Sequence, residues 1–429
     1  MEFQSTNQHL LSQRITVYND GFGLVKEVRQ VQGKKDVNKI RFLDISPEIE
    51  ADSILIEGLH VLEQSYTSNL VSKEKLLEKY IEKIILVKNE KQNEEMEIRL
   101  LSGADPIIAE RIDTGEIIIS PSGQLIFPLL PEGLFTKPAL VCKITAMEAD
   151  SEVEISYLTK GLEWRANYVA KICGSAINLT GWFQITNNSG MNFSGSQFKL
   201  AAGKVNRYID GSALQMHSKL FSIAGEPDSS FQKHRVADSH VYSMNRPVTI
   251  LNNQIKQISF LTIEEVVFRR LYKVDAHSHQ AKIVVEFDNI EANKLGIPLP
   301  LGIVKVYEQD MGDEMMFVGE DAIQNTAIGQ KVCLSIGKAF DIISESWEKK
   351  RERSDHFDCI TYIYKVHNQK SEHIRVDVKH EVFEQIWEME SSSHDYELKQ
   401  SNELEFRVHI SAGKKVEVEF TYKVDRRII

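Results

Sequence analysis

The feature that most constrains this chain is a period of two in its hydrophobic residues. Apolar and polar side chains alternate through residues 152–157, 177–186, 403–410 and 415–422. Successive side chains of a β-strand point to opposite faces of the sheet, so this alternation predicts strands with one buried and one solvated face. The chain is therefore predicted to be mostly β, with antiparallel sheets.

Short turn sequences separate these strands. Residues 19–21 (Asn-Asp-Gly), 121–123 (Pro-Ser-Gly), 252–253 (Asn-Asn) and 411–413 (Ser-Ala-Gly) each lie between two strand-like runs. These residue types tolerate the positive φ angles that tight hairpin turns need. Short strands that follow one another at this spacing predict several antiparallel β-sandwich or small-barrel domains in tandem.

One segment follows a helical period instead. Its apolar residues recur at i, i+1, i+4, i+5 and i+8, and they are Leu76, Leu77, Tyr80, Ile81 and Ile84. Charged residues occupy the other face, and Ser72 precedes the segment in a suitable N-cap position. The pattern predicts one short amphipathic helix near residues 72–84, followed by a hairpin of residues 84–88 and 96–101.

The length of 429 residues allows two to four domains. Shifts in the pattern predict an N-terminal β unit at 1–66, a helix plus small β-barrel at 67–146, a β-sandwich at 147–270 and a C-terminal β-sandwich at 275–429. The third of these contains a long loop at 203–245. That stretch has no clear periodicity, and so long a segment without it indicates a functional loop or disorder.

Charge and cysteine content restrict the compartment and the partners. The chain has 62 acidic and 51 basic residues and a net charge of −11, which argues against a general nucleic-acid-binding protein. It shows neither a signal-peptide pattern nor the roughly 18 consecutive apolar residues of a membrane span. Its four cysteines include no C-x-x-C pair. We therefore expect a cytoplasmic location, no membrane insertion and no nucleic-acid partner.

Two sequence blocks resemble a known family. Residues 157–168 read Tyr-Leu-Thr-Lys-Gly-Leu-Glu-Trp-Arg-Ala-Asn-Tyr, and residues 295–300 read Leu-Gly-Ile-Pro-Leu-Pro. In this order they resemble the uncharacterised bacterial family of unknown-function domains that includes the mucoidy inhibitor A-like proteins. The resemblance extends from about residue 14 to the end and implies β-rich, sandwich-type domains. It implies no reaction, and this chain lacks the coiled-coil insertion and export signal of the longer members.

Four residues are candidates for interaction with a partner. Trp182 lies on the polar phase of its strand, so either another part of the chain covers it or a partner can reach it. Trp387 is followed by a Ser-rich loop, and His394 and Tyr396 lie in or next to that loop. By contrast, Trp164 and Tyr168 lie on one face of a strand and are interpreted as core anchors, with an aromatic ligand platform as the alternative.

No pattern in the sequence identifies a catalytic, cofactor-binding or metal-binding residue. The chain has no G-x-S-x-G, no Walker loop and no G-x-G-x-x-G after a strand. Residues 393–395 read Ser-His-Asp, but neighbours on a strand or turn point apart and do not form a triad. His277 and His279 lie on one side of a strand and are too few for a zinc site by themselves. We therefore predict no catalytic residue, cofactor or metal.

Two functions of different classes remain. The first is a non-enzymatic interaction or scaffold protein that presents β-sandwich edges and loops to a protein partner or to itself. The alternative is a hydrolase that acts on a polysaccharide or peptide with carboxylates in an inter-domain cleft. The absence of specific catalytic motifs favours the first, so the chain is more readily interpreted as a binding protein than as an enzyme.

Overall fold

The computed structural model describes most of the chain as β-sheet, with one α-helix in the described residues. These residues are 2–33, 37–67, 71–89, 94–131, 134–145, 149–203, 205–207, 233–236, 239–310, 312–384 and 386–426. The prediction of a mostly β chain with several sheets and one short helix is confirmed. No helix in this part of the chain is long and apolar enough to cross a bilayer.

The chain divides into two compact units. Unit 1 contains Met1–Glu163, Thr186–Lys204 and Lys233–Ile255, and unit 2 contains Trp164–Ile185 and Lys256–Ile429 together with residues 205–207. The domain ranges predicted from the sequence run consecutively, whereas each unit draws on separate stretches. Within the predicted 203–245 loop the structure shows two strands, and residues 204, 208–232 and 237–238 lie outside the described residues.

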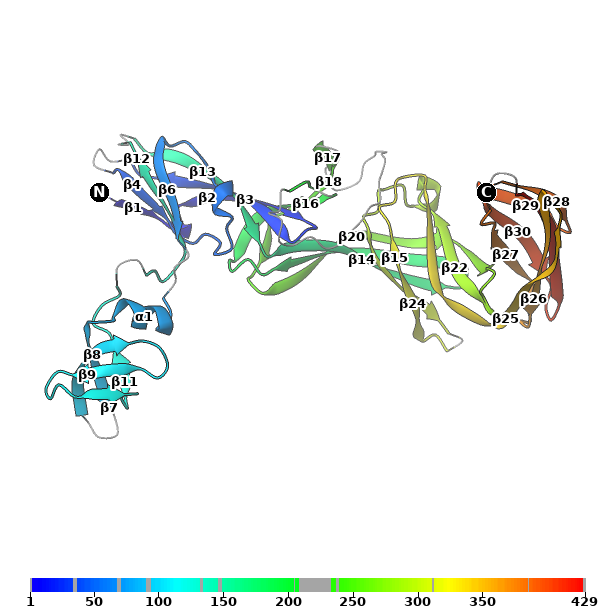
Figure 1. Ribbon diagram of the computed structural model, residues 1–429. Helices are drawn as coiled ribbons and strands as arrows, with labels where there is room; N and C mark the ends of the chain where they lie inside the picture. The colour runs from blue at the N-terminus through cyan, green and yellow to red at the C-terminus, as the bar shows by residue number, and fades with distance from the viewer. Residues whose placement is uncertain are drawn as a thin grey trace. The chain divides into compact units, whose positions relative to one another are not determined.

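Unit 1 contains two larger sheets (Figure 1). The first has the order β1 (Glu2–Ser5), β4 (Lys39–Phe42), β12 (Ala139–Ile144), β6 (Val61–Thr67). The second has the order β17 (Lys233–Val236), β18 (Ser239–Ser243), β16 (Phe193–Ala202), β2 (Leu10–Tyr18), β3 (Phe22–Val31), β13 (Ser151–Lys160), β5 (Leu55–Glu57), and β19 (Val248–Ile250) pairs with β16. The 19–21 turn joins β2 to β3 as the predicted antiparallel hairpin, and Gly21 has φ +80°.

The buried side of β3 carries a charged pair. Glu27 and Arg29 are fully buried and form an ion pair of 2.6 Å. The guanidinium also donates to the carbonyl oxygens of Ser5, Leu43 and Asp44, so each of its five donor hydrogens has a partner. Every charge in this pair is therefore compensated, as a buried pair requires.

The carboxylate of the pair is equally well supported. Its second oxygen, Oε1 of Glu27, accepts from Gln13 at 2.8 Å and from the Tyr157 hydroxyl at 3.3 Å. Burial, followed by the charge of Glu27, raises the pKa of Tyr157 well above its ordinary value, so Tyr157 remains a donor. The network joins β2, β3 and β13 through their side chains.

A smaller sheet in unit 1 carries the helix. α1 (Lys73–Lys79) begins after Ser72, whose hydroxyl accepts from the Lys75 amide at 3.3 Å, as the N-cap prediction requires. The helix is shorter than predicted, because Glu82 has φ +65° and Ile84 already begins β7. Leu77 and Tyr80 pack into the core of the sheet, and α1 lies beside it (Figure 1).

This small sheet has five strands. Their order is β10 (Ile117–Ile119), β9 (Ile108–Arg111), β8 (Glu94–Ser102), β7 (Ile84–Asn89), β11 (Gln124–Ile126). The predicted hairpin of β7 and β8 is confirmed. The turn at 121–123 does not form a hairpin, because β10 pairs with β9 while β11 pairs with β7. It therefore connects the two edges of the sheet.

Unit 2 begins with a five-stranded sheet. Its order is β20 (Gln254–Val267), β15 (Ala176–Asn187), β14 (Leu162–Cys173), β23 (Gly302–Gln309), β24 (Met315–Ile323). Trp164 and Tyr168 are both buried, as the core interpretation expects. The Trp164 ring meets Phe183 edge to face at 5.5 Å, and the Tyr168 hydroxyl donates to the Pro300 carbonyl at 2.7 Å.

The rest of unit 2 is a nine-stranded sheet. Its order is β28 (Trp387–Ser392), β31 (Lys415–Asp425), β26 (Phe357–Asn368), β25 (Lys331–Arg353), β22 (Gln280–Asp288), β21 (Arg269–Val274), β27 (Ile374–Glu381), β30 (Glu403–Ile410), β29 (Tyr396–Gln400). β30 and β31 are far apart in this order, yet Phe406 of β30 stacks on Phe420 of β31 at 4.9 Å. The sheet therefore folds over a single core, and the 411–413 turn connects its two layers instead of closing a hairpin.

Most strand pairs in the described part of the chain are antiparallel, as predicted, but some are parallel. The parallel pairs include β1 with β4, β2 with β16, β14 with β23, and β21 with β27. Three short 3-10 helices complete the described structure, at Asn7–His9, Ala51–Ser53 and Glu291–Asn293. The alternation of apolar and polar residues along one strand does not show whether the neighbouring strand runs parallel or antiparallel to it. The parallel pairs were therefore not predicted.

His380 lies among the aromatic rings of this core. Its Nδ1 is 3.0 Å from the Tyr364 hydroxyl, which donates to the Lys379 carbonyl, and its Nε2 has no partner in the described residues. Burial lowers the pKa of His380 to about 4. The imidazole is therefore neutral in the folded state at physiological pH.

Replacing Arg29 with Met is expected to destabilise unit 1 by about 3–5 kcal/mol, because it leaves the Glu27 carboxylate buried without its counter-charge. All four tryptophans lie in unit 2, so hydrogen exchange of β3 peptides is the suitable measurement. The double variant Glu27→Gln with Arg29→Met is the control, because it leaves no buried charge, and it is expected to recover part of the lost protection. Unchanged exchange in the single variant contradicts a stabilising role for the pair.

Unit 2 is expected to lose stability in mild acid through His380. The unfolded imidazole takes up a proton near pH 6.5, whereas the folded one does so near pH 4. The contribution of the neutral His380 ring to the free energy of unfolding is complete above about pH 6.5. It falls by about 2 kcal/mol at pH 5 and is lost as the pH approaches 4. His380→Phe keeps a ring and removes the titration, so urea unfolding followed by tryptophan fluorescence is expected to depend less on pH in this variant. An equal pH dependence in both proteins would rule out this origin.

Candidate functional site

The predicted interaction residues lie in two different sheets. Trp182 is half-buried on β15, and its neighbour Phe183 points to the opposite, fully buried side. Trp387 is half-buried on β28, where its ring meets Tyr422 at 6.1 Å and packs against the core. Trp387 therefore belongs to the margin of the core, and most of its apolar surface is already in use.

The other two predicted residues follow Trp387 along the chain. His394 lies in the turn after β28, and its Nδ1 is 2.8 Å from the Ser393 hydroxyl. The Ser393 hydroxyl also accepts from the Glu419 amide, so it takes part in the anchoring of the turn. Tyr396 is exposed on β29, with its ring 6.0 Å from that of Phe406. The serine and histidine of the Ser-His-Asp sequence thus meet, and no contact links Asp395 to them in the described residues.

Three of the four predicted residues therefore lie at the ends of the nine-stranded sheet. β28 and β29 are its two terminal strands, and each pairs with only one neighbour in the described structure. On β29 the side chains of Tyr396 and Leu398 extend the core side beyond Phe406 and Leu404. Leu398 is 53% exposed, because no further strand covers it.

The solvent side of the same sheet contains a shallow depression of about 380 Å³. Six of its lining residues are cationic, three are acidic and one is apolar: Arg269, Lys273, Lys331, Arg375, Lys399 and Arg407; Glu286, Asp377 and Glu405; and Leu271. The lining therefore carries three more positive than negative charges, in a chain whose net charge is −11. Two carboxylates outside the lining also pair with these cations, Asp288 with Arg269 and Glu397 with Lys399 and Arg407, so one positive charge remains in excess when they are included. A local excess of positive charge attracts anions.

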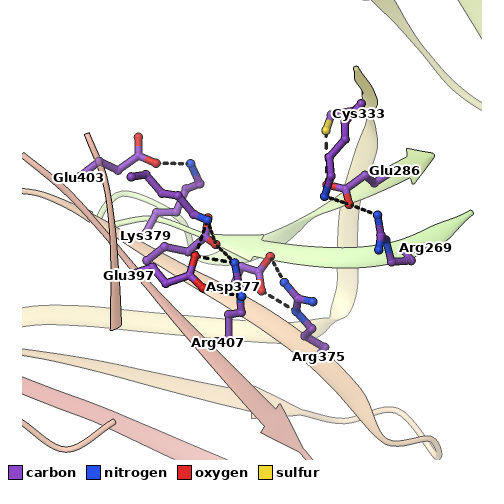
Figure 2. A network of polar contacts seen from close by, with 12 residues as sticks. Arg269, Glu286, Cys333, Arg375, Asp377, Lys379, Glu397, Glu403 and Arg407 are labelled. Atoms are coloured by element: carbon purple, nitrogen blue, oxygen red, sulfur yellow. Dashed lines mark hydrogen bonds and ion pairs between the residues drawn. The ribbon is translucent and has the colours of Figure 1, made fainter. Parts of the chain in front are cut away.

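One cluster of ion pairs surrounds Glu286 (Figure 2). Its carboxylate pairs with Arg269 at 2.9 Å and with Lys331 at 3.2 Å, and it accepts from the Cys333 thiol at 3.6 Å. Burial alone raises the pKa of Glu286, but the hydrogen bond and charge of Lys331 and the charge of Arg269 outweigh it, so the pKa lies below its ordinary value. Glu286 is therefore an anion and cannot serve as a proton donor at neutral pH.

A second cluster lies on β27, β29 and β30 (Figure 2). Asp377 binds Arg375 through two hydrogen bonds of 2.9 and 3.2 Å. Arg407 and Lys399 both bridge Glu397 and Glu405. These pairs lie within single strands or join β29 to β30, the next strand along the chain, and they fix the positions of the cationic side chains.

The acidic groups lie deeper than the cationic groups. The side chains of Asp377 and Glu405 are 3% and 9% exposed, whereas their cationic partners remain partly exposed. Asp377 and Glu286 therefore hold Arg375, Arg269 and Lys331 from beneath, whereas Arg407 and Lys399 also pair with the exposed Glu397. Such an arrangement is pre-organised for binding an anionic partner, because the side chains are already ordered.

Lys273 differs from the other cations. Within the described part of the chain its ammonium makes no hydrogen bond and no ion pair. It lies on β21, directly across from Asp377 in the parallel pairing with β27. That carboxylate is engaged with Arg375, so Lys273 is the cation of the lining that forms no ion pair with the described residues.

The potential metal ligands of the described residues do not form a cluster. Among the described residues no three His, Cys, Asp or Glu side chains come together in a group that could hold a metal ion. His277 and His279 lie in and after the turn between β21 and β22, without a third ligand. In the depression, Glu286 does not provide a neutral carboxylic acid for acid catalysis, because its pKa lies below the ordinary value.

The depression was not predicted from the sequence. A signal is present, since β27 reads Arg375, Asp377 and Lys379 on its polar phase and β30 reads Glu405 and Arg407. Alternating opposite charges within one strand indicate cross-strand pairs. The partner strands cannot be identified without the sheet order, so the signal alone does not locate a site.

No protein-family model matches the chain, and no curated protein matches it. The family resemblance remains an expectation from the sequence, and the candidate site has to be interpreted from its own geometry.

Replacing Asp377 with Ala is expected to destabilise unit 2 by about 2 kcal/mol, because it removes a buried carboxylate and leaves Arg375 without its partner. Urea unfolding followed by tryptophan fluorescence measures this change. Glu397→Ala is the matched control in the same network, and it is expected to leave the unfolding midpoint unchanged because Glu397 is solvent-exposed. Equal losses of stability in the two variants would show that burial of the carboxylate does not determine the strength of these ion pairs.

Proposed function

We propose that this protein is a non-enzymatic interaction protein that offers the β29 edge of its C-terminal sheet to an extended segment of a protein partner. The observation that carries the proposal is that this edge is unpaired on one side and exposes apolar side chains. β29 pairs only with β30 in the described structure, and Tyr396 and Leu398 are exposed on its core side. A cytoplasmic location, expected from the cysteine content, belongs to the same proposal.

An open edge of this kind binds peptides for two reasons. The backbone amide and carbonyl groups of a terminal strand that face away from the sheet can pair with an added strand. The exposed apolar side chains then gain burial against alternate residues of that strand. Tyr396 and Leu398 continue the layer of Phe406 and Leu404, so a partner strand here extends an existing core.

A protein partner is favoured over a second copy of this chain. Two β29 strands would have to bring identical charged faces together, each with the positive excess of the neighbouring depression. Like charges across an interface oppose association. Self-association is retained as an outcome of the test.

The hydrolytic alternative gains no support from this depression. Its carboxylates are engaged with arginine and lysine side chains, and the pKa of Glu286 is lowered. A retaining or inverting glycosidase requires one carboxylic acid that is protonated near neutral pH. The binding proposal needs no such group.

Leu398→Glu is expected to weaken partner binding at least tenfold, because a charge then lies where the partner strand is buried. The measurement is affinity capture from lysate with quantitative mass spectrometry, comparing the wild-type protein with variants. Leu62→Glu is the matched control, since Leu62 is 54% exposed on β6, which is also a terminal strand.

The proposal predicts a protein that the wild-type chain and Leu62→Glu retain and that Leu398→Glu loses. Light scattering on the same samples identifies self-association, which shows as a dimer that only Leu398→Glu abolishes. The proposal is wrong if all three proteins retain the same set of proteins, or if the wild-type chain retains none.

A further inference from the structure

Beside the β29 edge, the cationic depression has the properties of a second contact surface. Its cations come from five of six successive strands, in the order β25, β22, β21, β27, β30 and β29. Five inter-strand steps of about 4.8 Å give a width of about 24 Å. The positive charge is therefore distributed along a line of strands and does not converge on one point.

This distribution selects for an elongated ligand. Five of the six cations already bind a carboxylate of the protein, and only the Lys273 ammonium makes no hydrogen bond or ion pair with the described residues. A small anion would meet one uncompensated charge, whereas a chain of anionic groups can meet several partly exposed cations at once. An extended peptide of about seven residues spans the width, at about 3.4 Å per residue.

We propose that this depression binds an extended acidic segment of a protein, rich in Asp and Glu. The identification of the ligand as a protein rests on the proposed function, and the acidic segment would adjoin the strand that pairs with β29. Lys273 supplies a charge without an ion pair, while Lys331, Arg375 and Arg407 supply side chains that Glu286, Asp377 and Glu405 already hold in place.

The chemistry of the lining favours peptide carboxylates over other polyanions. No aromatic side chain lines the depression, and its single apolar residue is Leu271. Single-stranded nucleic acids bind with bases stacked on aromatic rings, so the lining lacks their main source of affinity. The net charge of −11 also repels a long polyanion that continues beyond the depression, whereas a short acidic segment avoids this repulsion.

The geometry of the strands also argues against a dedicated phosphate site. Phosphate groups are commonly held by backbone amides at a helix N-terminus or in a glycine-rich loop. Here the lining residues other than Lys399 belong to strands that are paired on both sides, so their backbone amides are used in the sheet. Side-chain cations are the remaining donors, and they suit carboxylates as well as phosphates.

The test uses a fluorescein-labelled octamer of glutamate with the full-length protein, and fluorescence anisotropy at about 50 mM NaCl. The wild-type protein is expected to bind the octamer, and binding is expected to disappear at about 500 mM NaCl. Lys273→Gln and Lys331→Gln are each expected to weaken binding about three- to tenfold. Thermal melting of each variant confirms that it is folded.

Lys349→Gln is the matched control for Lys331→Gln. Both lysines lie on β25, their side chains are 49% and 56% exposed, and each pairs with one glutamate, Glu419 and Glu286 respectively. Only Lys331 lines the depression. The control is expected to change the affinity less than twofold, since it lies outside the depression.

Three results would overturn the proposal. The first is that the wild-type protein does not bind the glutamate octamer. The second is that Lys349→Gln and Lys331→Gln lose equal affinity for it. The third is that the protein binds a labelled thymidylate octamer more tightly than the glutamate octamer. The last result would assign the surface to nucleic acid. The Leu398→Glu capture experiment is independent of these measurements, so failure of the acidic-segment proposal and failure of the edge-pairing proposal are distinguishable.

Discussion

The C-terminal half of this protein depends on one long strand with two sets of neighbours. β25 has 23 residues; its first part pairs with β22 and its last part pairs with β26. This double pairing makes one continuous sheet that closes over its own core, where Phe406 stacks on Phe420. Because the sheet closes by packing and not by hydrogen bonds, it retains two terminal strands, β28 and β29. The open edge and the charged face beside it both follow from this constraint.

The two units use charge in different ways. In unit 1 the Arg29 guanidinium has all five donors bound within the protein, and both it and Glu27 are fully buried. Nothing remains with which a ligand could pair, so this network is structural. In unit 2 Asp377 and Glu405 are buried but their cationic partners stay partly exposed, and Lys273 forms no ion pair with the described residues. The distinction between a structural and a binding network lies in these uncompensated donors.

In the proposed function, the basic depression on an acidic chain assists recognition. The net charge of −11 keeps most anions away, and the local excess of positive charge at the depression directs an acidic segment to one place. Such steering acts mainly on specificity and on the rate of association. The apolar edge at Tyr396 and Leu398 can then contribute to the lifetime of the complex through burial. In the proposed function, the two surfaces supply complementary parts of binding.

The sequence by itself determined the local features of this protein. Alternation identified the strands, Ser72 and its apolar stripe identified the helix, and the 19–21 turn identified a hairpin, because each depends on residues close together in the chain. Only the tertiary structure decided that the 411–413 turn joins two layers, that Glu27 and Arg29 share the buried side of β3, and that strands from residue 269 to residue 407 form one charged face. These features depend on which strands pair and in which register. Long-range packing of the core determines the pairing and the register, and a local hydrophobic pattern does not reveal either of them.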